Sequence, residues 1–316
     1  MVWISSLSNY ADFLLTTTSL NSIAKRCGVG LLYHAVFESV PAALGDTLHN
    51  VTPDQLYDHL KRLKQHFEIV NVDEFIKFPD YSRHAFVTFD DGYKTVIQSA
   101  LPVLESLSIP ATIYINGKTF DNKILWRDKI RFIIENDLVE EFLVGTDSIA
   151  VDNSKPFYRY SKDARNNSQQ IDQALDLFFE KNEINSSQTN FCFDDASWFI
   201  EHPLLSYGNH CHAHYVMSSL SKHEQKLEIN LTKDLLARHV DIGQSRLLSI
   251  PFGDDGDFNE YTIRAADELG YSGVLLSRGK INIKHSNQYG VSAVERFMPK
   301  GDDIDATVAK AYSKSI

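Results

Sequence analysis

The sequence predicts an α/β protein that is built on a mainly parallel sheet. Short runs of β-branched and aromatic residues recur along the chain, and each has the composition of a buried strand. Segments with helical apolar spacing and helix-capping residues lie between these runs. Strands that alternate with helices need crossover connections, and such connections join parallel strands. A closed barrel and an open doubly wound sheet both satisfy this pattern.

Six apolar runs are predicted to form the strands of this sheet. Their β-branched and aromatic side chains suit a buried, pleated surface, and their shortness favours strands over helices. They span residues 28–34, 85–89, 111–115, 247–251, 273–276 and 291–297.

The first predicted helix begins with a capping box. Thr52 and Gln55 are spaced so that each side chain can bond to the other residue's backbone, and Pro53 occupies the first helical position. The apolar residues that follow on one face are Leu56, Leu60 and Leu63.

Two further helices have their own signals. Ser221 and Glu224 repeat the capping box. The apolar face behind them is predicted to consist of Leu227, Leu231 and Leu235. A third helix is expected to open near Asp257 and to stop at Gly270, where a left-handed residue fits.

Residues 121–190 interrupt the alternation of strands and helices. Residues 125–134 have helical apolar spacing, whereas residues 152–170 are polar and rich in Asn, Ser and Lys. We expect a partly helical insertion within a single domain that spans residues 1–316.

Composition excludes several classes of protein. The 316 residues are 43% hydrophobic, which supports a large buried core and excludes a disordered chain. A formal net charge of −11 repels phosphate backbones and anionic membrane surfaces, so nucleic acid is not an expected partner. The three cysteines lack C-x-x-C spacing and favour a reducing compartment. Residues 1–20 resemble neither a secretion signal nor a transmembrane segment, so we expect a cytoplasmic protein.

Two adjacent carboxylates follow the predicted strand at residues 85–89. Asp90, Asp91 and Gly92 come directly after it, at the end of a parallel strand where such folds place their active sites. One of two neighbouring acids there can bind a metal ion while the other takes part in proton transfer. A plain Asp-Asp-Gly turn is the alternative interpretation.

Three histidines lie within residues 210–214. His210 and His214 are four residues apart, so in one helical turn they would share a face and bind one ion, with His212 directed elsewhere. With Asp91 they form a two-histidine, one-carboxylate set, which leaves coordination positions open for water and substrate. Cys211 is not expected to be a ligand, because its neighbour His210 already faces the ion.

Together these residues resemble the polysaccharide deacetylases of carbohydrate esterase family 4. Residues 88–92 are similar to the first motif of that family at every position. His210 and His214 are similar to its H-[S/T]-x-x-H motif, with Cys211 in place of the Ser or Thr. The resemblance covers residues 31–297, and its motif order is closest to the circularly permuted poly-N-acetylglucosamine deacetylases.

The resemblance implies a distorted (β/α) barrel, often of seven strands, with an insertion between the first and second motifs. It also implies a divalent metal, most often Zn²⁺, and Asp90 as the general base. The backbone N–H of Phe252 is the expected oxyanion donor, and Tyr93 and Pro251 are expected beside it at the substrate.

The chain departs from the family at two points. The third motif has Ser249 where an arginine is expected, and Arg296 is a candidate replacement. No histidine follows His285, so the acid histidine of the C-terminal motif is missing. In the permuted branch the corresponding histidine comes first, which makes His34 the candidate acid.

The predicted function is metal-dependent removal of N-acetyl groups from an amino sugar in cell-surface polysaccharide, lipopolysaccharide or O-antigen biosynthesis. The expected substrate is an N-acetylated sugar, sugar nucleotide or oligosaccharide, processed in the cytoplasm, with the inner face of the membrane as one site. A deformylase or another metal-dependent amidohydrolase on a modified sugar would use the same residues. A catalytically silent carbohydrate-binding relative is the second alternative.

Overall fold

The computed structural model describes residues 19–146, 149–185, 190–288 and 290–316. Its strands form one sheet in the order β1-β3-β4-β5-β6-β7-β9-β8, with β2 beside β3. The strands are β1 (Val29–Tyr33), β2 (Glu68–Ile69), β3 (His84–Phe89), β4 (Ala111–Ile115), β5 (Leu205–Asn209), β6 (Gln244–Ser249), β7 (Gly273–Leu276), β8 (Asn287–Gln288) and β9 (Val291–Glu295). All pairs are parallel except β8 with β9. The sequence missed β5, whose residues Leu-Ser-Tyr-Gly-Asn include no β-branched side chain.

The sheet closes into a barrel. Leu31 of β1 pairs in parallel with Phe297, just beyond β9. The N–H of Leu32 donates to the Phe297 carbonyl at 2.9 Å, and the N–H of Phe297 donates to the Gly30 carbonyl at 3.0 Å. Seven parallel strands, β1, β3, β4, β5, β6, β7 and β9, therefore form the ring. The predicted seven-stranded (β/α) barrel is confirmed, and the open doubly wound sheet is wrong.

Side chains alternate between the inside and the outside of the barrel, as the period of a strand requires. One apolar cluster includes inward residues of five strands, namely Phe86, Tyr114, Leu247, Leu275 and Val294. At Gly30 of β1 a Cβ atom would lie 2.4 Å from the Phe86 ring, so that strand needs glycine there. Toward the carboxyl ends of the strands the same inward positions carry Thr88, Asp90, Ser249 and Arg296, which places polar chemistry at that end.

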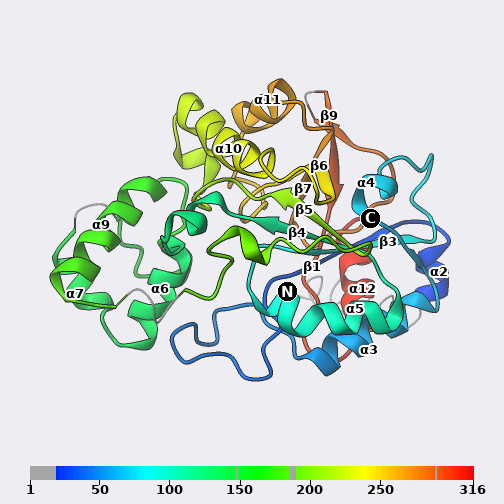
Figure 1. Cartoon of the computed structure of the whole chain (residues 1–316), viewed down its shortest axis with the longest axis horizontal. Coiled ribbons are helices and arrows are strands. Elements are labelled where there is room, and N and C mark those ends of the chain that lie inside the picture. Colours follow the sequence, from blue (N-terminus) through cyan, green and yellow to red (C-terminus); the bar gives the residue numbers. More distant parts are fainter. Residues whose placement is uncertain (1–18, 147–148, 186–189, 289) are drawn as a thin grey trace, which may run out of the picture.

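Helices cover the barrel (Figure 1). They are α2 (Leu20–Ala24), α3 (Pro53–Lys64), α4 (Val72–Phe75), α5 (Leu101–Leu107), α6 (Trp126–Glu135), α7 (Val139–Val144), α8 (Phe157–Tyr160), α9 (Ser168–Lys181), α10 (Lys222–Leu236), α11 (Glu260–Glu268) and α12 (Ile304–Ser313). A π-helical turn, Val96–Ala100, precedes α5, and short 3₁₀ turns span Gly117–Asp121, Ala196–Trp198 and Met217–Ser219. The third predicted helix, α11, starts later than expected at the N-cap Asn259, and Gly270 follows its end with φ +85°.

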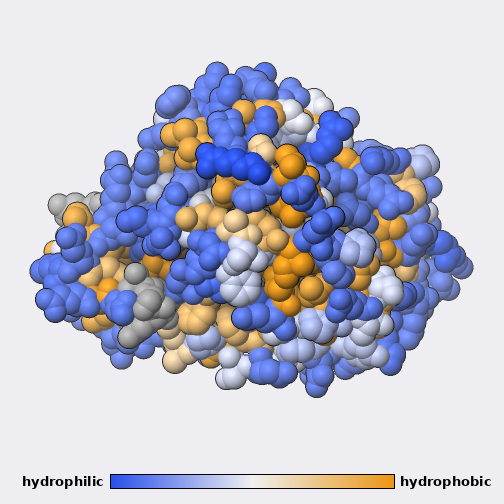
Figure 2. Space-filling view, in the orientation of Figure 1, coloured by the Kyte–Doolittle hydropathy of each residue, from blue (hydrophilic) through white to orange (hydrophobic). Residues whose placement is uncertain are grey.

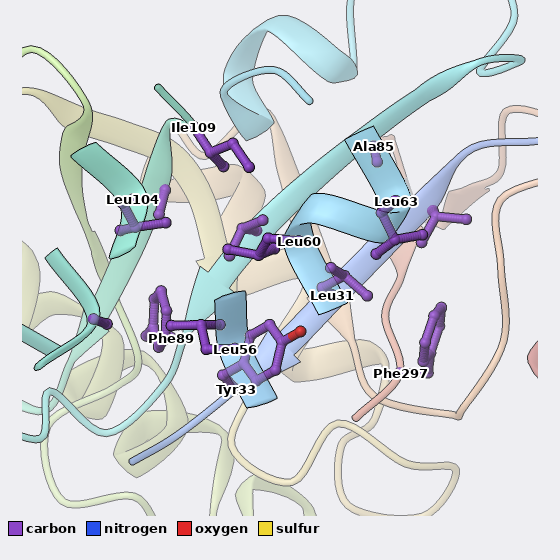
Figure 3. Close-up of a cluster of buried hydrophobic side chains, with 14 of the residues drawn as sticks. Leu31, Tyr33, Leu56, Leu60, Leu63, Ala85, Phe89, Leu104, Ile109 and Phe297 are labelled. Atoms are coloured by element: carbon purple, nitrogen blue, oxygen red, sulfur yellow. The ribbon is translucent and has the colours of Figure 1, made fainter. Parts of the chain in front are cut away.

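The predicted first helix, α3, packs against the outside of β1. The N–H of Gln55 donates to Thr52 Oγ1 at 3.2 Å, and the N–H of Thr52 donates to Gln55 Oε1 at 3.0 Å, which completes the capping box. Figure 3 shows its leucines beside Leu31 and Tyr33 of β1. These fully buried leucines are Leu56, Leu60 and Leu63, as the sequence predicts.

The predicted apolar face of α10 is wrong for two of its three leucines, whereas the third, Leu235, is partly buried and packs against the core. Leu227 and Leu231 are 46% and 39% exposed. The buried face instead includes Gln225, Glu228 and Thr232. The reason is local, because this face covers the loop after β5, and that loop needs hydrogen-bond partners.

The segment between β4 and β5 contains the predicted helices. Figure 1 shows α6, α7 and α9 gathered at one end of the molecule, beside the barrel. Phe142 and Phe178 of this segment share a hydrophobic cluster with Val216 and Ile229, which lie after β5. The assignment of residues 1–316 to a single domain stays a prediction.

The surface is mainly hydrophilic on the face in Figure 2, with hydrophobic side chains gathered near its middle. No helix in the described part of the chain is long and apolar enough to cross a membrane. The expectation for the N-terminal segment concerns residues 1–20, of which residues 1–18 lie outside the described residues. All three cysteines are free and buried.

Candidate active site

Asp90 and Asp91 face the same pocket although they are neighbours in the chain. Successive residues of a strand point to opposite faces, so a turn is needed to bring both carboxylates together. Asp91 and Gly92 supply this turn with φ angles of +69° and +67°. Both carboxylates are nearly fully buried and line the pocket.

Asp91 meets the two predicted histidines. Its Oδ1 lies 3.5 Å from His210 Nε2 and 3.3 Å from His214 Nε2. His210 Nδ1 donates to the Ser249 carbonyl at 2.8 Å, since a carbonyl only accepts. This bond leaves the Nε2 of a neutral His210 ring with its lone pair toward Asp91.

The loop that holds the histidines is not helical, and the helical premise of the sequence argument is wrong. Residues 210–214 adopt an irregular turn, with φ of +61° at Cys211 and +58° at His214. The two rings still come together, with centroids 4.8 Å apart. His212 lies away from them, with Nε2 at 3.8 Å from Asp121 Oδ2.

Buried polar side chains from other elements hold this loop in place. Asn116 Nδ2 donates to the His210 carbonyl at 2.5 Å, and Thr232 Oγ1 donates to the Cys211 carbonyl at 3.0 Å. The N–H of Ala213 donates to Glu228 Oε2 at 2.7 Å. Cys211 itself is fully buried, and burial raises the pKa of its thiol well above the ordinary value. It is not part of the cluster of ligand atoms in the described chain.

The three converging groups fit a divalent cation. One ligand atom from each of Asp91, His210 and His214 lies within 4.8 Å of the others. Ligands about 2.0–2.1 Å from a tetrahedral Zn²⁺ are separated by about 3.3–3.4 Å, close to the two distances found at Asp91. The buried Asp91 Oδ1 has no hydrogen-bond partner in the described residues. Burial disfavours the charged form of both side chains: it raises the pKa of Asp91 to about 8 and lowers the pKa of His214 well below its usual value. A cation would stabilise the ionised carboxylate of Asp91, and the neutral ring of His214 can bind it.

Asp90 is held by an arginine from the last strand. Arg296 Nη1 and Nη2 donate to the two Asp90 oxygens at 2.8 and 2.9 Å, and Ser249 Oγ donates to Oδ2 at 3.0 Å. Burial alone would raise the pKa of Asp90, but the Arg296 guanidinium outweighs it and the pKa falls to about 2. The third motif has Ser249 in place of its arginine, and the fully buried Arg296 supplies the guanidinium that pairs with Asp90 instead.

His34 lines the same pocket, and a second histidine partners it. His49 Nε2 donates to the Pro299 carbonyl at 2.7 Å, so its Nδ1 is an acceptor when the ring is neutral. His34 Nδ1 lies 3.4 Å from this acceptor and is therefore the protonated nitrogen. Burial first, and then His49, lower the pKa of His34 well below 6.5. The nearby Asp90 carboxylate raises the pKa of His34, but it does not outweigh burial and His49.

The three residues predicted at the substrate have different positions. Phe252 lines the pocket with φ +62°, and its ring lies 4.6 Å from that of His214. No hydrogen bond within the described chain uses its backbone N–H, which leaves this donor free for an oxyanion. Pro251 is buried behind it and does not line the pocket. Tyr93 is also buried away from the pocket, where its hydroxyl donates to Asp128 Oδ1 at 2.9 Å.

The pocket has a volume of about 470 Å³. Besides the predicted residues, its lining includes side chains that the sequence argument missed. Those from the segment between β4 and β5 are Arg127, Arg131, Tyr158, Arg159 and Lys162. Lone basic residues inside a polar insertion carry no sequence signal of a site, so only the fold places them here.

Comparison with known proteins agrees with this architecture. Residues 79–149 and 200–274 match the family model of the polysaccharide deacetylases, and these segments contain Asp90, Asp91, His210 and His214. No curated protein sequence matches the chain at a significant level.

Two solved structures share the fold. The deacetylase PplD of Streptococcus pyogenes, in complex with acetate, is 16% identical with a TM-score of 0.51, over 86% of this chain and 92% of PplD. IcaB from Ammonifex degensii is 16% identical with a TM-score of 0.52, over 90% of this chain and 98% of IcaB. The chain is thus similar to the polysaccharide deacetylases in the two matched segments, and it shares the fold of PplD and IcaB.

Proposed function

We propose that the protein is a metal-dependent hydrolase that removes the N-acetyl group from an amino sugar, in the synthesis of a cell-surface polysaccharide such as O-antigen. The observation that carries the proposal is one pocket in which Asp91, His210 and His214 converge beside an Asp90 carboxylate held by Arg296. This set combines a place for a cation with a separate group for proton transfer.

Asp91, His210 and His214 would hold the metal, which we propose to be Zn²⁺ because imidazole and carboxylate suit it. A divalent ion there would acidify water and polarise the acetamide carbonyl. His210 Nδ1 carries the proton, because it donates to the Ser249 carbonyl, and this leaves Nε2 of the neutral ring as the nitrogen that can bind the metal. Three protein ligands leave room for water and substrate.

Asp90 is proposed to accept the proton of the attacking water. With its pKa at about 2 the carboxylate is ionised at neutral pH, so it is ready to accept. The bidentate contact with Arg296 fixes its two oxygens, and fixed geometry lowers the entropy cost of the step. The free N–H of Phe252 is proposed to donate to the oxyanion of the tetrahedral intermediate.

His34 is proposed to give a proton to the departing amine from Nε2. Its Nδ1–H is directed toward His49, so Nε2 is the nitrogen that exchanges protons with the pocket. Because its pKa is low, the ring gains this proton only with substrate bound, when negative charge develops nearby.

The expected substrate is an N-acetylated sugar, sugar nucleotide or oligosaccharide. The cytoplasm, including the inner face of the membrane, is kept as the proposed compartment, because three free and buried cysteines suit a reducing environment.

The test is a screen of N-acetylated and N-formylated sugars with purified protein and added Zn²⁺, in which acetate and formate are measured. Acetate release that a chelator abolishes supports the proposal. Formate as the main product identifies a deformylase instead. Less than stoichiometric metal together with neither product indicates a silent carbohydrate-binding relative.

A further inference from the structure

One wall of the pocket is cationic and comes from the segment between β4 and β5. Arg127 lies on α6, Arg159 on α8, and Lys162 just after α8, and all three line the pocket. The chain as a whole carries a net charge of −11, so composition alone does not explain cations gathered at the catalytic pocket. Cations in this position can bind an anionic group of the substrate.

Arg127 is buried without a carboxylate partner. The residue is 2% exposed, and no acidic oxygen in the described chain lies within 4.0 Å of its guanidinium nitrogens. Nη1 donates to Ser161 Oγ at 3.0 Å and Nη2 to the Tyr158 carbonyl at 2.9 Å, while Nε has no partner among the described residues. Burial accordingly lowers the pKa of Arg127. A buried charge without a counter-charge is strongly unfavourable.

The other buried cations nearby are paired. Arg131 contacts Asp128 and donates to the Tyr158 hydroxyl at 3.0 Å. Arg296 binds Asp90 with both terminal nitrogens. The fold therefore neutralises its buried cations in this region, and Arg127 stands out as the exception.

Arg127 and Lys162 share one aromatic ring beside the candidate metal ligands. Lys162 Nζ lies 4.6 Å and the Arg127 guanidinium 5.6 Å from the centre of the Phe252 ring. That ring in turn lies 4.6 Å from the ring of His214. An anionic group held by these cations would thus lie next to the reacting acetamide.

The acidic residues of the pocket do not neutralise this wall. Asp46 and Asp254 line the pocket, but neither forms an ion pair within the described chain. Lys162 has one distant carboxylate, Asp257 Oδ2 at 3.9 Å. Arg159 lies in the lining without an ion pair in the same part of the chain. The positive charge of this wall is therefore not neutralised within the described chain, and the wall can bind an anion.

We propose that Arg127, Arg159 and Lys162 form a subsite for an oxyanion of the substrate. This inference rests on the proposed function and narrows it to an N-acetylated amino sugar that carries a phosphate or a carboxylate close to its acetamido group. Guanidinium groups match both oxyanions with paired N–H donors, and a neighbouring ammonium adds charge.

Kinetics with matched substrates test the inference. The phosphate arm is N-acetylglucosamine 1-phosphate with UDP-N-acetylglucosamine, the carboxylate arm is N-acetylmuramic acid, and the neutral reference is methyl N-acetylglucosaminide. For one arm, wild-type kcat/KM should exceed that of the reference at least tenfold. In Lys162→Gln and Arg159→Gln this preference should fall roughly tenfold, the value of one charge-assisted hydrogen bond.

Lys123→Gln is the matched control. Lys123 lies in the same segment, is exposed and does not line the pocket, so its removal changes the net charge equally and should keep the preference. An equal effect of Lys123→Gln and Lys162→Gln would reduce the subsite to general electrostatics and overturn the inference. Equal kcat/KM for anionic and neutral substrates would do the same.

Binding without turnover separates this inference from the proposed function. Glucose 1-phosphate, glucuronic acid and glucose carry no acetamide, and their binding is measured by titration calorimetry. Tighter binding of one anionic sugar, weakened in Arg127→Gln that folds by circular dichroism, supports the subsite even if no acetate is released. Acetate release together with equal binding of all three sugars refutes the subsite and leaves the deacetylase proposal intact.

Discussion

At the scale of single residues, the site depends on how buried charges find partners across the barrel. Asp90 and Arg296 are 206 residues apart in the sequence, and their contact is possible because β3 and β9 both flank β1 in the closed ring. The residues around Asp90 indicated its role, whereas the role of Arg296 could not be read from its own neighbours in the chain. A pair of this kind makes the stability of the fold depend on pH.

We predict that the Asp90–Arg296 pair stabilises the fold above about pH 4 and loses this effect in acid. The folded pKa of about 2 is below the ordinary value of 3.8, so the unfolded state binds the proton first as pH falls. The pair should contribute about 2 kcal/mol to the free energy of unfolding, and this contribution disappears as pH falls through 2. Urea unfolding of wild type and Asp90→Asn measures it. A difference between the two proteins that stays constant from pH 5 to pH 2 would contradict the assignment.

We predict that His34→Ala lowers kcat on acetamide substrates by about 10²–10⁴-fold while metal content is unchanged, because a general acid contributes that much. An aryl acetate ester is the control, since its leaving group needs no proton. The variant should approach wild-type turnover on the ester. Equal losses on both substrates would assign His34 to the fold or the metal site.

His49 is expected to act through His34. His49→Phe keeps the ring but removes the acceptor for His34 Nδ1–H, so the tautomer of His34 is no longer fixed. We predict a loss in kcat of roughly tenfold on acetamides, a displaced pH profile and little change in KM. His49→Gln, which offers an amide oxygen and an N–H, should restore part of the activity. The proposed positioning role fails if both variants leave the pH profile unchanged.

At the scale of elements, α10 explains the non-helical loop after β5. Its capping box was predicted from Ser221 and Glu224 and is present, but its buried face, predicted from leucines, is mixed: Gln225, Glu228 and Thr232 are buried beside Ile229 and Leu236. The buried polar residues meet the carbonyls and N–H groups that an irregular loop leaves unpaired. A sequence pattern for apolar periodicity cannot detect a helix that buries hydrogen-bonding groups.

We predict that Thr232→Val weakens metal binding by about tenfold, in the range found when groups that orient metal ligands are lost. Valine keeps the shape of threonine but removes the bonds to the Cys211 carbonyl and the Gly117 N–H. The control is Leu227→Ala on the exposed face of the same helix, which should bind metal as wild type does. Competition with a chromophoric zinc chelator measures both. Equal affinities for wild type and Thr232→Val would show that the loop holds its ligands without α10.

At the scale of the whole molecule, the apolar runs and their alternation with helices predicted six of the seven strands of the ring but not β5, and the resemblance added the closure into a seven-stranded barrel. His210 and His214 could be named because the two histidines lie four residues apart, and Asp91 because an Asp-Asp-Gly sequence directly follows a predicted strand. Arg296 could only be named as a candidate, because its partner is distant in sequence. Arg127, Lys162 and His49 could not be found, since an isolated basic residue or histidine has no pattern before the fold brings it to the pocket.

The central claim is that one metal bound by Asp91, His210 and His214 is required for acetate release. The most direct measurement is a Zn²⁺ titration of metal-free protein in which bound metal and acetate release from an N-acetylated sugar are followed together, for wild type, His214→Ala and His212→Ala. We predict that activity and bound metal saturate together at about one equivalent in wild type and in His212→Ala, and that His214→Ala shows neither. Full metal binding and activity in His214→Ala, with both lost in His212→Ala, would contradict the claim.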